Sequence, residues 1–413
     1  MNATDVPSDR FHIHILAFAA LGPGVSGGDK IFMECARVWL ARGHRITAYV
    51  TEEGSAMLDR YGLTGVERVV LDCAWWMRIH FAAHYLVKTL RAILFARTLR
   101  LASGERHVVF SAGDSPPDVF PAWALRRRHP MARWAAAFYF FAAPPWPSRR
   151  DEAYRGGRLP VTFRSVAWFL LQQMTYPLIR RGADFVVVCN QLDVERMAED
   201  GVPASRTWPI YGGIDLDGMK AVPEPTEKTW DACFVGRFHA QKGVLPLLDL
   251  WAKVVREIPR ARLAIIGEGS LRPRMEARIA ELHLGANAEI LGYLDGEPKG
   301  RVLKASRLFL HPPTHDTGGM AAAEAMGCGL PVVGFDLPGY LHCYPRGMRK
   351  VPVGNLDAFA AAVVALLKDD AARNALAREA AAFARDWDWP RRATRLEEIF
   401  FSLFRKGEPN GAP

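Results

Sequence analysis

Hydrophobic and polar residues alternate along this chain in blocks. Short apolar runs end in glycine or polar residues, and each is followed by a longer segment with apolar positions every three or four residues. The first blocks predict a strand at Phe11–Ala20, a glycine loop at Gly22–Gly28, a helix at Lys30–Arg42 and a strand at Arg45–Thr51. Strands that alternate with helices favour a parallel sheet covered on both faces, so we expect a doubly wound α/β fold.

The alternation of strands and helices occurs twice. It runs first to a strand at Asp184–Cys189, where Asn190 is placed to cap the next helix, and it resumes at Asp231 and continues to about Ala384. A chain of 413 residues, 50% of them hydrophobic, is long enough to bury two cores. We therefore expect a first domain over 1–215, a linker rich in proline and charge over 216–228, a second domain over 229–385 and a C-terminal segment over 386–413.

Two carboxylates flank a glycine pair in the second half of the chain. Asp316 and Glu324 lie eight residues apart, with Gly318 and Gly319 between them, and the segment continues into the apolar run that ends at Val333. The glycines let the backbone approach a ligand closely, and the helix predicted from Met320 would present its first amides to an anion. This pattern is typical of a site for an anion rich in hydroxyl groups, such as a sugar with a phosphate. A surface loop followed by an ordinary amphipathic helix would give the same residue pattern.

A basic loop follows the first strand of the second domain. Asp231-Ala-Cys-Phe-Val-Gly236 runs directly into Arg237, and Lys242 follows five residues later. One arginine and one lysine at the carboxyl end of a strand suit a diphosphate, because arginine binds it with two donors and lysine acts as a point charge. Two further short strands, Arg262–Gly267 and Ala288–Leu294, follow in order before the acid pair.

In this order, the motifs resemble those of the GT-B retaining glycosyltransferases of family four, which take a sugar from a nucleotide diphosphate donor. The resemblance is strong over residues 230–405 and looser over residues 10–215. It implies two Rossmann-like domains that face a cleft, a C-terminal helix that crosses back to the first domain, and no cofactor or metal beyond the donor itself. It also implies catalytic roles for Asp316, Arg237 and Lys242, and donor contacts from Gly27, Gly28, Gly236, Arg237, Lys242, Gly292, Leu294, Asp316, Gly318, Gly319, Met320 and Glu324.

Two positions depart from the family pattern. Asp316 replaces the usual glutamate, so its carboxylate is one methylene shorter. Family members carry a histidine near the sugar in the first domain, whereas this chain has Phe140 and Phe141 there. His12 and His14 alternate on the first predicted strand, where a core or strand-edge role is favoured over a catalytic one.

Two other functions remain open at this stage. Gly22-Pro-Gly24-Val-Ser-Gly27 fits the glycine pattern of dinucleotide-binding folds, and Glu52 follows the second strand where a ribose-binding acid is found, so the chain could be an NAD-dependent oxidoreductase. The absence of the histidine near Phe140 also allows a catalytically silent protein that binds nucleotide sugars as a scaffold.

The basic charge of the chain is concentrated in one segment. Residues 74–181 contain 17 lysines and arginines against five acids, a net +12 in a chain whose total is +9. Together with Trp75, Trp76, Trp168 and Phe169 this predicts peripheral contact with an anionic membrane that presents a glycan or glycolipid acceptor, while core helices with snorkelling arginines remain the alternative. No nucleic-acid module accompanies the charge.

The remaining composition points to a cytoplasmic enzyme, peripheral on the inner face of the membrane. The six cysteines show no Cys-x-x-Cys spacing and indicate neither disulfides nor a metal site. The first ten residues lack the apolar core of a signal peptide, and no apolar run approaches the roughly 20 residues that a membrane-spanning helix needs.

Overall fold

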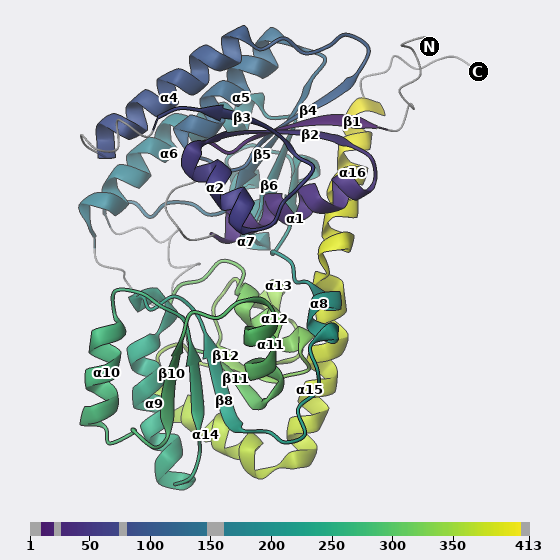
Figure 1. The fold of residues 1–413 in the computed structure, drawn as a ribbon. Coiled ribbons are helices and arrows are strands. Elements are labelled where there is room, and N and C mark those ends of the chain that lie inside the picture. Colours follow the sequence, from purple (N-terminus) through teal and green to yellow (C-terminus); the bar gives the residue numbers. More distant parts are fainter. Residues whose placement is uncertain (1–9, 20–25, 74–80, 147–160, 406–413) are drawn as a thin grey trace. The chain divides into compact units, whose positions relative to one another are not determined.

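The computed structural model describes residues 10–19, 26–73, 81–146 and 161–405, which divide into two compact units. Unit 1 contains the described residues within 1–146, 161–212 and 389–413, and unit 2 contains residues 213–388 (Figure 1). Each unit has one parallel sheet with helices packed on it, so the predicted α/β class is confirmed. None of the described helices is long and apolar enough to cross a membrane.

Unit 1 is built on a seven-stranded parallel sheet in the order β3-β2-β1-β4-β5-β6-β7. Its strands are β1 Phe11–Leu16, β2 Arg45–Thr51, β3 Glu67–Leu71, β4 Arg106–Ser111, β5 Arg133–Phe138, β6 Phe185–Val188 and β7 Thr207–Pro209. Its helices are α1 Gly27–Ala41, α2 Glu52–Arg60, α4 Phe81–Thr98, α5 Pro116–Arg128, α6 Phe163–Gly182, α7 Gln191–Glu199 and α16 Trp389–Arg405. β2 has the predicted bounds, and the Asn190 side chain caps α7 as predicted by accepting the Asp193 amide.

Both faces of this sheet are buried, because successive side chains of a strand point to opposite faces. One face packs against α4, α5 and α6 through a core that includes Leu16, Trp134 and Ile179. On the other face Phe11 of β1 meets Phe400 of α16, with ring centroids 6.2 Å apart. Burial on both sides explains why the strands read as continuous apolar runs in the sequence.

The C-terminal helix α16 belongs to unit 1, which confirms that the chain crosses back. The indole of Trp39 in α1 donates a hydrogen bond to the Ala393 carbonyl (3.1 Å), and the two Trp39 and Phe400 rings lie 5.4 Å apart. Glu397 bonds the His44 ring (2.7 Å) and pairs with Arg42. α16 starts at Trp389, within the C-terminal segment expected over 386–413.

Unit 2 contains a six-stranded parallel sheet in the order β10-β9-β8-β11-β12-β13. Its strands are β8 Trp230–Val235, β9 Leu263–Ile266, β10 Ala288–Gly292, β11 Ser306–His311, β12 Val332–Phe335 and β13 Met348–Val351. Its helices are α8 Leu216–Ala221, α9 Val244–Glu257, α10 Arg272–Glu281, α11 Gly296–Lys304, α12 Met320–Gly327, α13 Tyr340–Cys343, α14 Leu356–Lys368 and α15 Asp370–Ala384, with short 3-10 turns η3 Ala240–Lys242 and η4 Arg385–Trp387.

The segment expected to be a linker, 216–228, starts as the helix α8 instead. The Asp215 side chain caps this helix by accepting the Gly218 amide (2.9 Å), and the Leu216 side chain is buried. An aspartate at the N-cap position indicates a helix start. The prolines and charged residues farther along the segment had indicated a linker instead. In this part of the sequence the first compact unit ends at Gly212, three residues before the expected end of the first domain at residue 215.

We expect Phe400→Ala to destabilise unit 1 by about 3–5 kcal/mol, because it removes a fully buried ring that contacts both β1 and α1. Chemical denaturation followed by tryptophan fluorescence measures this loss. Arg395→Ala on the exposed side of the same helix is the control and should stay within about 0.5 kcal/mol of the parent. Equal stability of the two variants would mean that α16 is not part of the core of unit 1.

Candidate functional site

The first candidate acid, Asp316, lies in the loop between β11 and α12. Its side chain is 8% exposed, and one carboxylate oxygen accepts the backbone amides of Thr317 (2.8 Å) and Gly319 (3.2 Å). The loop therefore folds around the carboxylate. This bonding fixes the position of Asp316 directly before the amino end of α12.

The other oxygen of Asp316 pairs with Lys242. The lysine Nζ lies 2.6 Å from Oδ2, and the lysine side chain is 30% exposed. Lys242 ends the turn η3 that follows β8, and Gly243 after it has φ +68°, where an added Cβ would lie 1.9 Å from the Pro312 carbonyl oxygen. Only glycine fits this close approach of the two loops, so it is Gly243 that lets Lys242 reach Asp316.

Charges around Asp316 keep it ionised despite its burial. Burial raises the pKa of Asp316, but the Lys242 ammonium, His311 and the bonds from Lys242 and Gly319 lower that pKa by more, so the net shift is downward. Burial lowers the pKa of His311 to about 4, and its ring bonds the Tyr340 hydroxyl at 2.7 Å. At neutral pH the site therefore holds a carboxylate and an ammonium beside an uncharged imidazole.

The amino end of α12 has no side-chain cap. Gly319 is the N-cap residue with φ +59°, and it has no side chain that could cap the helix that Met320 starts. The carbonyls of Gly318 and Gly319 both accept the Tyr344 hydroxyl, at 3.0 and 2.7 Å, which holds the turn in place. Uncapped amides at a helix start, beside glycines, are suited to bind an anion.

The second candidate acid, Glu324, is held by a lysine that the sequence analysis missed. Its carboxylate lies 2.9 Å from Nζ of Lys299 in α11, and the two side chains are 8% and 11% exposed. Lys299 also pairs with Asp295 at 2.8 Å. Burial lowers the pKa of Lys299, but Glu324 and Asp295 raise it by more, so the lysine stays charged. The only sequence signal was the Asp295 and Lys299 spacing of four residues, which is common on helices.

The other predicted residues of unit 2 lie on the loops that follow β8 and β10. The Arg237 side chain is exposed, and the structure records no ion pair for it among the described residues. The Gly236 amide bonds the Ile266 carbonyl (3.0 Å), and the Gly267 amide bonds the Gly292 carbonyl (2.8 Å), so these turns are joined by backbone bonds. Leu294 follows Gly292 and is partly buried.

Gly27 and Gly28 belong to unit 1, at the start of α1, so the structure does not test their predicted donor contacts. An added Cβ at Gly28 would lie 2.5 Å from the Tyr139 ring, which explains a glycine there by packing alone. Most of the glycine loop before them lies outside the described residues. Glu52, the candidate ribose acid of the oxidoreductase hypothesis, accepts the Cys73 amide at 2.9 Å and so has a structural partner.

Near Phe140 the structure places an acid that the sequence analysis did not consider. The Gln172 amide donates to the Phe140 carbonyl (2.9 Å) and to Asp114 (2.6 Å). Burial raises the pKa of Asp114 to about 6 although the Gln172 bond lowers it, so this acid titrates near neutral pH. Phe140 itself stacks on Trp168 with ring centroids 6.3 Å apart, and Phe141 contacts the Arg196 guanidinium.

Comparison with known proteins points to one family for this site. Residues 218–383 match the family model described as glycosyl transferases group 1. Phosphatidyl-myo-inositol mannosyltransferase of Mycobacterium tuberculosis is 29% identical over 262 residues, which cover 60% of this chain and 66% of that protein. The enzyme of the same name from Mycolicibacterium smegmatis is 25% identical over 230 residues, 55% of this chain and 54% of that protein. The chain thus matches about half to two thirds of the length of these relatives.

Solved structures show the fold more completely. Anabaena HepE, solved in complex with UDP and glucose, aligns with a TM-score of 0.69 at 15% identity and covers 95% of this chain and 100% of its own. This likeness confirms the predicted GT-B fold. The match to the family model of glycosyl transferases group 1 covers residues 218–383, the segment that contains Lys242, Asp316, Lys299 and Glu324.

Proposed function

We propose that this protein transfers a sugar from a nucleotide diphosphate sugar to a glycan or glycolipid of the cell envelope, with retention of configuration. The observation that carries this proposal is the Lys242 and Asp316 ion pair directly before the amino end of α12, which has no side-chain cap. The names of the relatives support it, since they include phosphatidylinositol mannosyltransferases, and a structural neighbour was solved with UDP and glucose.

In this proposal the positive groups stabilise the leaving diphosphate. The developing charge on the diphosphate is the main electrostatic demand of the reaction, and preorganised donors meet it without rearranging during the reaction. Arg237, Lys242 and the first amides of α12 are these donors, with Gly236, Gly318 and Gly319 allowing close approach. Retention follows from attack on the same face of the sugar as the leaving group, which needs no nucleophile from the protein.

The two acids have different roles. Asp316 lies before the helix and is proposed to bind the transferred sugar, whereas Glu324 lies one turn inside α12 and is proposed to bind the ribose hydroxyls. Lys299 holds the Glu324 carboxylate in one orientation, so it is a positioning residue. Gly292 and Leu294 are proposed to contact the base of the donor, and Gly27 and Gly28 its phosphate and sugar.

A thermal-shift screen against a panel of nucleotide sugars tests the function as a whole. A donor present at 100 times its dissociation constant should stabilise the protein by about 2.7 kcal/mol. The absence of any shift across nucleoside diphosphates and their sugars would refute the proposal. A protein that binds the donor but never hydrolyses or transfers its sugar would instead be the catalytically silent scaffold.

Replacing the two acids should separate binding from turnover. Glu324→Ala is expected to weaken binding of the nucleoside diphosphate by at least tenfold, about 1.4 kcal/mol, because ribose contacts are lost. Asp316→Ala is expected to lower kcat by about 100-fold or more with a smaller change in that affinity. Isothermal titration and a donor-hydrolysis assay measure the two effects. Glu297→Ala, an exposed acid on α11, is the control; unchanged nucleotide affinity in Glu324→Ala would remove the ribose assignment.

Arg237 and Lys242 should differ in their effect on folding. Arg237 is exposed, whereas Lys242 neutralises the buried Asp316. We expect Arg237→Ala to lose transfer at parental stability, and Lys242→Met to lose transfer and about 1–3 kcal/mol of stability. Adding Asp316→Asn to Lys242→Met should restore part of the stability and none of the transfer.

Arg260→Ala, an exposed arginine elsewhere in unit 2, is the matched control for these variants. Transfer within tenfold of the parent in the Arg237→Ala, Lys242→Met double variant, about 1.4 kcal/mol in barrier height, would place the diphosphate elsewhere.

The acceptor side of the proposal rests on two helices of unit 1. Leu86, Leu90 and Leu94 recur every four residues on α4, and each is more than half exposed. On α6 the side chains of Phe163, Leu170 and Met174 are also more than half exposed. Neither helix contains an acid. Exposed apolar rows on helices without acids, in a segment of net charge +12, suit peripheral contact with an anionic membrane at its inner face.

Two of the four aromatic residues first considered for this contact are partly buried. Trp168 and Phe169 are partly buried, Trp168 against Phe140 and Phe169 against Trp146. Trp75 and Trp76 lie outside the described residues. Part of the apolar segment is therefore packed inside the protein, which agrees with the alternative interpretation. The proposed membrane contact is made by Leu86, Leu90 and Leu94 of α4 and by Phe163, Leu170 and Met174 of α6.

Liposome flotation tests the membrane contact. The parent should float with anionic vesicles and not with neutral ones, and flotation should weaken as the Debye length falls from about 10 Å at 0.1 M salt to about 3 Å at 1 M. The double variant Leu90→Glu, Leu94→Glu should lose flotation, whereas Leu341→Glu, an exposed leucine of unit 2, should not. Equal behaviour on neutral and anionic vesicles, or in both variants, would favour a soluble acceptor.

A further inference from the structure

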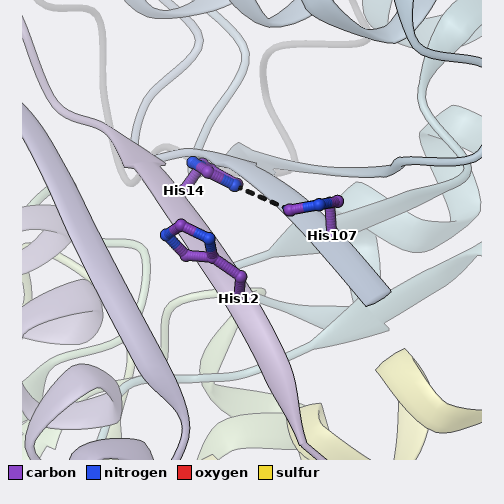
Figure 2. A group of neighbouring side chains, drawn as sticks. All are labelled: His12, His14 and His107. Carbon is purple, nitrogen blue, oxygen red and sulfur yellow. Dashed lines mark hydrogen bonds between the residues drawn. The ribbon is translucent and has the colours of Figure 1, made fainter. Parts of the chain in front are cut away.

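Three histidines of unit 1 meet at the amino ends of β1 and β4 (Figure 2). His12 and His14 lie two residues apart on β1, so their side chains share the face of the sheet that Leu16 also occupies. His107 on the neighbouring strand is the register partner of His12. One ring nitrogen of each histidine lies within 4.8 Å of the others, and His14 and His107 are buried.

Each ring has one nitrogen bonded to a group outside the cluster. The partners are the Thr47 hydroxyl for His12 Nε2 (2.8 Å), the Tyr49 hydroxyl for His14 Nδ1 (2.9 Å) and the Ala102 carbonyl for His107 Nε2 (2.8 Å). Histidines that bind a metal almost always use their second nitrogen in this way, which fixes the ring and the tautomer. Of the remaining nitrogens, His14 Nε2 and His107 Nδ1 bond each other, and His12 Nδ1 faces Glu105 (Figure 2).

Hydrogen-bond direction shows where lone pairs must lie. The Ala102 carbonyl can only accept, so Nε2 of His107 carries the proton and Nδ1 of the neutral ring is a lone pair. Thr47 donates its hydroxyl to Glu67 (2.8 Å), so its oxygen accepts the proton of His12 Nε2, and His12 Nδ1 is also a lone pair.

A carboxylate faces one of these lone pairs. Glu105 Oε2 lies 3.5 Å from His12 Nδ1, is buried, and has no hydrogen-bond partner. Two electron-rich atoms at this distance repel each other unless a positive charge lies between them. A cation bound between the two atoms supplies such a charge and also takes the nearby ring nitrogens of His14 and His107.

The separation of the other two nitrogens also fits a shared ion. His14 Nε2 and His107 Nδ1 lie 3.0 Å apart. Two nitrogens bound to one tetrahedral zinc ion at about 2.0–2.1 Å would lie about 3.3 Å apart, so small ring rotations suffice. Binding of the ion would move the proton of the His14 ring from Nε2 to Nδ1. The Tyr49 hydroxyl, which donates to Nδ1 before binding, would then accept from it, and no proton would be released to solvent.

We propose that His12 Nδ1, His14 Nε2, His107 Nδ1 and Glu105 Oε2 form a four-coordinate site for a divalent cation of the zinc class. Three imidazoles and one carboxylate are a donor set that zinc accepts, and four protein ligands without an open position indicate a structural ion. The site lies at the amino ends of the strands, whereas parallel sheets bind substrates at the carboxyl ends. The ion joins β1 to β4 and is independent of the transfer reaction proposed above.

Metal content and binding of the untagged full-length chain test the site. The protein purified without chelator should contain about one equivalent of zinc by mass spectrometry, and Zn²⁺ added back to chelated protein should raise its Tm. Co²⁺ should give the intense visible bands of a four-coordinate ion without a thiolate charge-transfer band, which separates this site from the cysteines. Less than about 0.1 equivalent, with no rise in Tm on adding Zn²⁺, would establish a network of neutral histidines instead.

Variants assign the ligands. Glu105→Gln keeps the volume of a partly exposed side chain and should weaken Zn²⁺ binding at least tenfold, and His12→Gln should do the same. Thr47→Val, which removes the bond to His12, should weaken binding by about 10–100-fold. His129→Gln, a nearby histidine that bonds the Leu99 carbonyl outside the cluster, should bind like the parent. Parental affinity in both Glu105→Gln and His12→Gln would overturn the proposal, whatever the activity of the enzyme.

Discussion

The candidate site of unit 2 depends on the pairing of two buried carboxylates with lysines from other elements. An unpaired charge in a protein interior is costly, and Lys242 and Lys299 supply the opposite charges beside Asp316 and Glu324. These pairs join the loop after β8 and the helix α11 to the segment 316–324. The local fold of unit 2 around α12 is thus set by where each buried charge finds its partner.

This pairing also decides where a diphosphate would find positive charge. Lys242 is already neutralised by Asp316, and Lys299 by Glu324 and Asp295 together. Among the described residues the exposed Arg237 has no recorded ion pair, and the amino end of α12 has no side-chain cap. A bound diphosphate would share Lys242 with Asp316, so binding of a diphosphate and the orientation of Asp316 would be coupled through one ammonium.

Strands, helices and caps that depend on neighbouring residues could be predicted from the sequence. Contacts between residues far apart in the sequence could not. β2 was predicted to the residue, and the Asn190 cap and the helix after Gly319 follow from local patterns. Lys299 was missed because its partner Glu324 is 25 residues away, with no spacing rule that links them. The burial of Trp168 was missed because helix α6 has apolar residues all around, so its periodicity does not tell the inner side from the outer.

The histidine cluster is the clearest case of information that only the fold supplies. His12 and His14 share a strand face, which favoured a role in the core, and nothing in the sequence relates them to His107, 93 residues beyond His14. Parallel pairing of β1 with β4 brings them together. A core position for histidine needs a partner for each nitrogen, and here the outer partners account for one nitrogen per ring while the inner nitrogens face one another and the Glu105 carboxylate. An apolar side chain at the buried positions of His14 and His107 would stabilise the sheet more simply. Two buried imidazoles, with the partly buried His12 and one carboxylate beside them, therefore fit the proposed cation.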